Sequence, residues 1–138
     1  MSSKIQLLFY LILAAFVISG CTVDVGNKTV GVRSGQFIYV DGSLRTEYRF
    51  PFDDVWAASE KVLADLNAVN IGKTRNIANG KFTGMIGDEK VTILIDYLTK
   101  DQTLTSVSVM VGPVGDSKAS RLIHDKITAI LLNKSEAK

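Results

Sequence analysis

The feature that most restricts the fold of this 138-residue chain is a series of segments with alternating side-chain character, joined by short turns. The clearest segment runs from Leu44 to Phe50. Side chains of a strand point alternately to opposite faces, so this segment predicts a strand with one buried and one solvated face. Asp41-Gly42 is a strong two-residue hairpin signal, and it pairs this strand with the apolar segment from Phe37 to Val40.

Four more segments have the same strand character and are separated by turn signals. The Asn79-Gly80 dipeptide predicts a hairpin turn, because both residues tolerate positive φ angles. Further turns are expected over Gly87–Lys90 and Lys100–Gln102. The four predicted strands are Ile71 to Ala78, Lys81 to Ile86, Val91 to Thr99 and Thr103 to Val111. Consecutive hairpins of this kind predict an antiparallel sheet.

Two segments have the three-and-four spacing of amphipathic helices. The first follows Pro51, and Asp53 and Asp54 place negative charge in its first turn, where the helix dipole favours it. The second is capped by Asp116 or Ser117. Their apolar stripes are Val55, Ala58, Val62, Leu66 and Val69, and Leu122, Ile123, Ile127, Ile130 and Leu131. The predicted fold class is α+β: a two-layer sandwich in the order ββαββββα, with both helices on one face of the sheet.

The N-terminus has the pattern of an export signal. Lys4 precedes an unbroken apolar run of twelve residues, Leu7 to Ile18, which is shorter than the ~20 residues that a transmembrane helix needs. The Ile18-Ser19-Gly20-Cys21 sequence that follows resembles the bacterial lipobox. This resemblance implies signal cleavage between Gly20 and Cys21 and acylation of Cys21, which would hold the protein at a membrane. The absence of Asp after Cys21 favours the outer membrane, facing the periplasm, if the organism has one.

These signals divide the chain into four parts. We expect a lipoprotein signal peptide over residues 1–20, a lipidated N-terminus and tether over 21–35, a single domain over 36–132 and a polar tail over 133–138. The tether has an alternative, because Val23, Val25, Val30 and Val32 alternate around Gly26-Asn27 and also fit a small hairpin.

The inventory of reactive residues argues against catalysis. One Cys and one His rule out sites with several cysteines or histidines, so no metal or cofactor is expected. Without Lys4, 15 basic residues remain against 14 acidic ones, a balance that argues against nucleic-acid binding. His124 fits a structural position on the last helix, and adjacent Asp53 and Asp54 diverge by about 100° on a helix. We therefore predict a non-enzymatic protein, with a hydrolase using Asp96 as the least favoured reading.

Two features indicate binding. Strand alternation places an apolar set on the face of the sheet away from the helices, and such a set often marks a contact surface. The set consists of Leu94, Leu98, Leu104 and Met110. Trp56 packs in the core or lines a groove between helix and sheet. The first hypothesis is a membrane-anchored interaction or structural module with a protein partner in the cell envelope. The alternative is a carrier of a lipid or small apolar ligand, held at Trp56.

A combination of short motifs gives the chain its family resemblance. The motifs are Cys21, Tyr39-Val40-Asp41-Gly42, Val55-Trp56-Ala57-Ala58 after Pro51, Val91-Thr92-Ile93, and Val111-Gly112 before Gly115-Asp116-Ser117. From Cys21 to about Leu132 the chain is similar to a family of short bacterial lipoproteins built on a domain of unknown function. The resemblance implies a lipid anchor and one α+β domain, and it supplies no catalytic residues.

Overall fold

The computed structural model describes residues 37–98 and 103–138. The predicted signal peptide, Gly20, Cys21 and the tether lie outside these residues. The elements are β1 (Ile38–Val40), β2 (Ser43–Tyr48), α2 (Phe52–Asp65), β3 (Val69–Arg75), β4 (Asn79–Ile86), β5 (Glu89–Tyr97), β6 (Thr105–Val111) and α3 (Ser117–Glu136). The predicted order ββαββββα and the α+β fold class are therefore confirmed.

The six strands form one sheet in the order β1-β2-β6-β5-β4-β3, and every neighbouring pair is antiparallel. The central position of β6 follows from its pairing with β2 on one side and β5 on the other, with Thr105 opposite both Tyr48 and Tyr97. Strand β3 is one edge of the sheet and β1 is the other. The chain thus builds the sheet from hairpins and closes its centre with its last strand.

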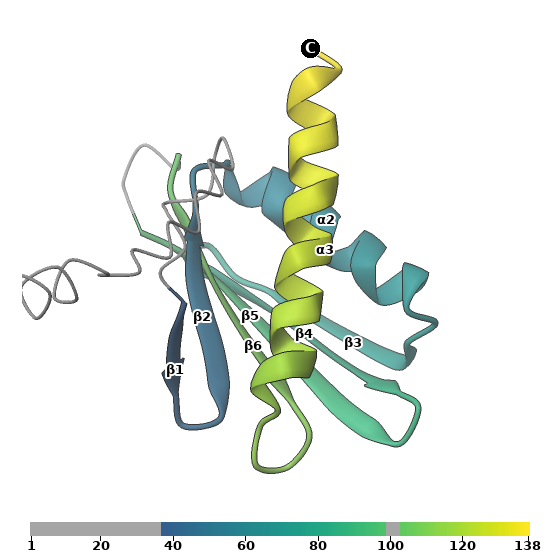
Figure 1. Ribbon diagram of the computed structural model, residues 1–138. Coiled ribbons are helices and arrows are strands. Elements are labelled where there is room, and N and C mark those ends of the chain that lie inside the picture. Colours follow the sequence, from purple (N-terminus) through teal and green to yellow (C-terminus); the bar gives the residue numbers. More distant parts are fainter. Residues whose placement is uncertain (1–36, 99–102) are drawn as a thin grey trace, which may run out of the picture.

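Both helices cover the same face of the sheet, where α3 runs across the strands and α2 lies beside it (Figure 1). Between the two layers is the hydrophobic core, which takes residues from β2, β4, β5 and β6 and most of the apolar stripes of the helices. Two residues of the predicted stripes do not join it: Leu122 is 53% exposed on α3, and Val69 lies in β3, past the end of α2, with 57% of its surface exposed. Its largest members include Tyr48, Phe52, Phe82, Ile93, Ile95 and Ile127. The alternation predicted for β2, β5 and β6 is confirmed, because their buried side chains are those assigned to the dry face, with the exception of Ser106 on β6, which is buried on the other face.

Two local predictions are confirmed and one is corrected. Asp41 and Gly42 have φ angles of 49° and 79°, as a tight hairpin turn requires, and the Asp116 side chain caps α3 by accepting hydrogen bonds from the backbone of Lys118 and Ala119. The predicted turn at Asn79-Gly80 is wrong. Both residues lie in β4, and the turn precedes them: the Asn76 backbone N–H donates to the Asn79 carbonyl at 2.8 Å.

The last helix is longer than the sequence pattern indicates. The domain was expected to end at Leu132, whereas α3 continues to Glu136. Lys134 contacts the Asp54 carboxylate of α2 from this extra turn. The polar residues after Leu132 therefore extend α3 beyond its apolar stripe and place a cation beside α2.

Candidate functional site

The face of the sheet opposite the helices carries the predicted apolar set. Leu94 on β5 lies opposite Ser108, and Met110 on β6 lies opposite Thr92, so the two side chains are diagonal neighbours. Leu94 is 40% exposed and Leu98 37%, while Leu104 and Met110 are half-buried. The structure thus places all four residues in or beside β5 and β6, with Leu94 and Met110 along the strands and Leu98 and Leu104 where the strands end.

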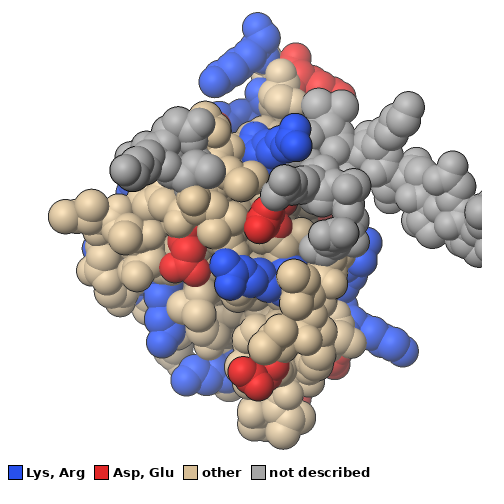
Figure 2. Space-filling view, turned by 90° about the vertical axis from the view of Figure 1, so that its left-hand side faces the viewer, with Lys and Arg blue, Asp and Glu red and all other residues tan. Residues whose placement is uncertain are grey.

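Polar side chains share this face with the apolar set. The Arg45 Nε donates to the Ser106 hydroxyl at 2.7 Å across the β2–β6 pair. Asp96 is half-buried between Asn79 and Ser106, its neighbours in the ladder. Figure 2 shows the left-hand side of Figure 1, the side of β1, where basic and acidic side chains are interspersed in a largely uncharged surface. Mixed charge of this kind on that side gives no field of a single sign that would attract a polyanion.

Trp56 on α2 lies in a cluster of aromatic rings. Its ring centroid is 4.1 Å from that of Phe82 and 5.9 Å from that of Phe52, and Phe52 stacks on Tyr97 at 4.4 Å. The indole also lies against Gly80, where a Cβ atom would approach Trp56 Cε3 to 2.8 Å. The space between α2 and the sheet at Trp56 is therefore filled by protein side chains.

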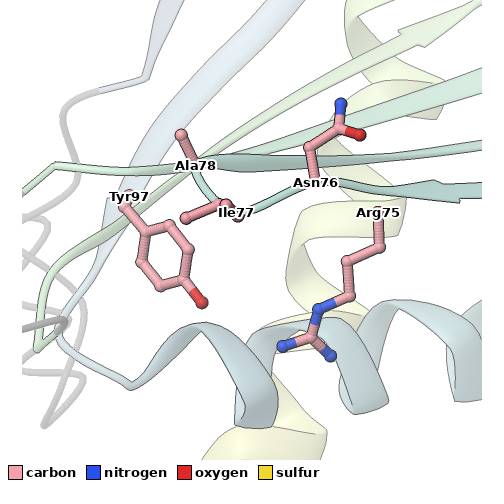
Figure 3. Close-up of a pocket in the computed structure, with 5 residues that line it drawn as sticks. All are labelled: Arg75, Asn76, Ile77, Ala78 and Tyr97. Atoms are coloured by element: carbon pink, nitrogen blue, oxygen red, sulfur yellow. The ribbon is translucent and has the colours of Figure 1, made fainter.

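An open pocket of about 810 Å³ lies beside this cluster, at the turn between β3 and β4. It is lined by Arg75, Asn76, Ile77, Ala78 and Tyr97. Arg75 and Tyr97 both point toward α2, with Ile77 between them (Figure 3). The pocket joins the end of β3 to the end of β5, residues that are more than twenty positions apart in the chain. Sequence reasoning did not single out Arg75 or Ile77, because no local pattern links them to Tyr97.

The Arg75 guanidinium lies over the rings of Phe52 and Trp56, 4.8 and 5.5 Å from their centroids. Its charge is paired with the Asp53 carboxylate, and this hydrogen bond raises the pKa of Arg75 above its ordinary value. Asp54, the neighbouring acid, contacts Lys134 instead. The two carboxylates therefore have separate partners and do not form a joint acid–base site.

His124 is fully buried, and both of its ring nitrogens have partners. Nε2 lies 2.8 Å from the Leu44 carbonyl, which only accepts, so Nε2 donates; Nδ1 then accepts from the Tyr48 hydroxyl at 2.8 Å. Burial lowers the pKa of His124 to about 4 and raises that of Tyr48. The neutral imidazole thus fastens α3 to β2, the structural role expected for it.

Within residues 37–98 and 103–138, no group of three or more His, Cys, Asp or Glu side chains is placed to hold a metal ion. Among the helices of these same residues, none combines the length and apolar character that crossing a bilayer requires.

Comparison with family models shows which protein family the chain belongs to. The model described as "Protein of unknown function (DUF3568)" matches residues 4–129. The chain belongs to this family. A comparison with curated proteins gave no match. The DUF3568 match covers the described sheet, both ends of the β3–β4 turn and most of α3, and it also includes the apolar run and Cys21 ahead of the domain.

Proposed function

We propose that this DUF3568 protein is a lipid-anchored, non-enzymatic protein of the bacterial cell envelope, and that its folded domain is an interaction module. The anchor is Cys21, acylated after cleavage behind Gly20, and the outer membrane is its favoured location if the organism has one. The family match supports this assignment, because it begins at residue 4 and so treats the apolar run and Cys21 as part of the family.

The observation that carries the interaction role is the sheet face opposite the helices. Both helices pack on one face, and on the other Leu94 keeps 40% of its surface exposed beside Met110. Removing apolar surface from water favours association by roughly 25 cal/mol per Å². Polar contacts that fix the position of a partner on this face would come from Arg45, Asp96 and the neighbouring hydroxyl groups.

Carriage of an apolar ligand between the helices and the sheet has less support. Trp56, the residue predicted to line that groove, packs against Phe82, Phe52 and Gly80. A ligand would have to displace these side chains to enter, and a core at native density resists such displacement. The first hypothesis is therefore the one that the geometry favours.

A photo-crosslinking amino acid in place of Leu94, in the full chain expressed in cells, tests the interaction. We expect a light-dependent adduct of defined mass, and mass spectrometry of the adduct distinguishes another envelope protein from a second copy of this chain. Leu122 is the matched control, since it is also an exposed leucine, at 53%, but lies on α3. Adducts of equal yield from both positions, or none from Leu94, would contradict a binding role for the sheet face.

A further inference from the structure

The most exposed large apolar side chain among the described residues is Ile77, at the turn between β3 and β4, with 98% of its surface accessible. The turn that presents it is closed by two hydrogen bonds: the Asn76 backbone N–H donates to the Asn79 carbonyl, and the Asn76 amide donates to the Asn79 side-chain oxygen at 3.1 Å. Ile77 is therefore held outward by a fixed turn, and docking would cost little ordering entropy.

The surroundings of Ile77 have the composition of a membrane-interface contact. Tyr97 is half-buried beside it, and its backbone N–H donates to the Ala78 carbonyl at 3.2 Å, which joins the end of β5 to the turn. Leu98 follows with 37% exposure. Arg75 rests its guanidinium on the aromatic rings and keeps 43% of its side chain in solvent. An aliphatic tip, a tyrosine and an arginine match the apolar and polar layers of a bilayer surface.

The charged residues near Ile77 differ from those near Val114, the other strongly exposed apolar residue. Val114 is 82% exposed in the loop between β6 and α3, at the opposite end of the sheet. The pocket beside Val114 is lined by Glu89, Asp116 and Lys118, which leaves an excess of negative charge there. At the Ile77 pocket, Arg75 is the one charged side chain among the described lining residues, and the Asp53 carboxylate offsets its charge. An anionic lipid surface would therefore favour the Ile77 end over the Val114 end.

The predicted tether brings a bilayer within reach. Fifteen residues separate Cys21 from Phe37, the first described residue. As a flexible coil they would span about 20 Å, so an anchored domain experiences a high effective concentration of lipid surface. Under that condition even one buried isoleucine, which favours the docked state by about ten-fold or more, is sufficient to orient the domain.

We propose that the turn carrying Ile77, together with Tyr97 and Arg75, docks on the surface of the bilayer that anchors the chain. This inference rests on the proposed function for its setting and adds an orientation to it. With the end of the sheet on the lipid, the strands stand away from the membrane, and the face bearing Leu94 is left open to a partner.

The test attaches the chain beginning at Cys21 to vesicles artificially. This chain retains the whole core cluster, which lies between Tyr48 and Leu131. Its only thiol, that of Cys21, is coupled to a maleimide lipid in vesicles of phosphatidylcholine and phosphatidylglycerol in equal parts. The result is thus independent of whether cells acylate Cys21. The readout is quenching of Trp56, the single tryptophan, by nitroxide-labelled lipids; its ring is 5.5 Å from the Arg75 guanidinium.

We expect headgroup-level nitroxides to quench Trp56 emission in the wild-type chain and in Val114→Asp. In Ile77→Asp the ratio of docked to undocked protein, obtained from the quenching, should fall by about ten-fold or more. Both substitutions are at exposed turn positions, and circular dichroism verifies that each variant is folded. Equal quenching in Ile77→Asp and wild type would overturn the proposal. So would an unquenched wild-type chain, the outcome expected of a tip that binds a protein. Neither result would affect the assignment of Cys21 as an acylation site, which is tested separately in cells.

Discussion

Among the single residues, Gly80 shows most clearly how a contact with a residue distant in sequence can require a particular residue type. It lies in β4 directly against the indole of Trp56, where any side chain would meet Trp56 Cε3 at 2.8 Å and Phe52 Cζ at 3.0 Å. The glycine is needed for helix–sheet packing, and its Asn-Gly pairing in the sequence does not mark a turn. Gly84, in the same strand, has ordinary contacts of 3.5 Å or more at the same point.

We therefore predict that Gly80→Ala destabilises the protein by about 1–3 kcal/mol, since the added methyl group overpacks the contact with Trp56. Gly84→Ala should leave the free energy of unfolding close to that of wild type. Urea denaturation followed by circular dichroism measures both variants, and the Trp56 emission maximum should move to longer wavelength only in Gly80→Ala. Equal stabilities for the two variants would show that the indole does not depend on this glycine.

His124 makes the stability of the fold depend on pH. Its pKa is lowered from 6.5 to about 4 by burial, so the unfolded chain binds a proton more readily than the folded one between these values. Stability contributed by the neutral ring is complete above pH 6.5 and is lost as pH falls toward 4. The loss amounts to about 3 kcal/mol, from 1.36 kcal/mol per pKa unit.

Replacing the histidine tests this dependence. His124→Gln keeps a group that can donate to the Leu44 carbonyl and accept from Tyr48, but the amide does not titrate. Urea unfolding of wild type should therefore weaken more steeply between pH 6.5 and 4 than unfolding of His124→Gln. Parallel pH profiles would mean that carboxylates account for the whole acid sensitivity.

Among the elements, α3 depends on a single capping side chain at its start. Asp116 Oδ1 accepts from the backbone N–H groups of Lys118 and Ala119 at 2.9 and 3.0 Å. We predict that Asp116→Ala lowers the free energy of unfolding by about 1 kcal/mol, and that Asp116→Asn, which retains an acceptor, loses less than half of that. Thermal or urea denaturation compares the three proteins. An equal loss in both variants would assign the effect to the charge of Asp116 and not to its hydrogen bonds.

The helices and strands also show which parts of the structure could be predicted from the sequence. Period-two alternation was sufficient to give the strand faces, because Leu94 and Met110 follow directly from the register of β5 and β6. Turn placement failed at Asn79-Gly80, since packing of Trp56 overrides the local preference there. The pocket at Ile77 had no signal at all, because pairing of β4 with β5 is what brings Tyr97 to the β3–β4 turn.

For the whole molecule, one two-layer domain has its helices on one face of the sheet, an apolar set on the other, and an exposed isoleucine at one end. The proposed acyl anchor at Cys21 connects this arrangement to function, because an anchored domain stays close to a lipid surface and weak contacts are then enough to orient it. The membrane attachment of Cys21 is therefore the central claim.

That claim is tested most directly by the mass of the N-terminal peptide of the protein isolated from cells. The account predicts that the chain begins at Cys21 and that this peptide is heavier than its sequence by the mass of a diacylglyceryl group, with a further acyl chain where the amino terminus is also modified. An N-terminal peptide that retains residues before Cys21, or that begins at Cys21 with an unmodified thiol, would contradict it.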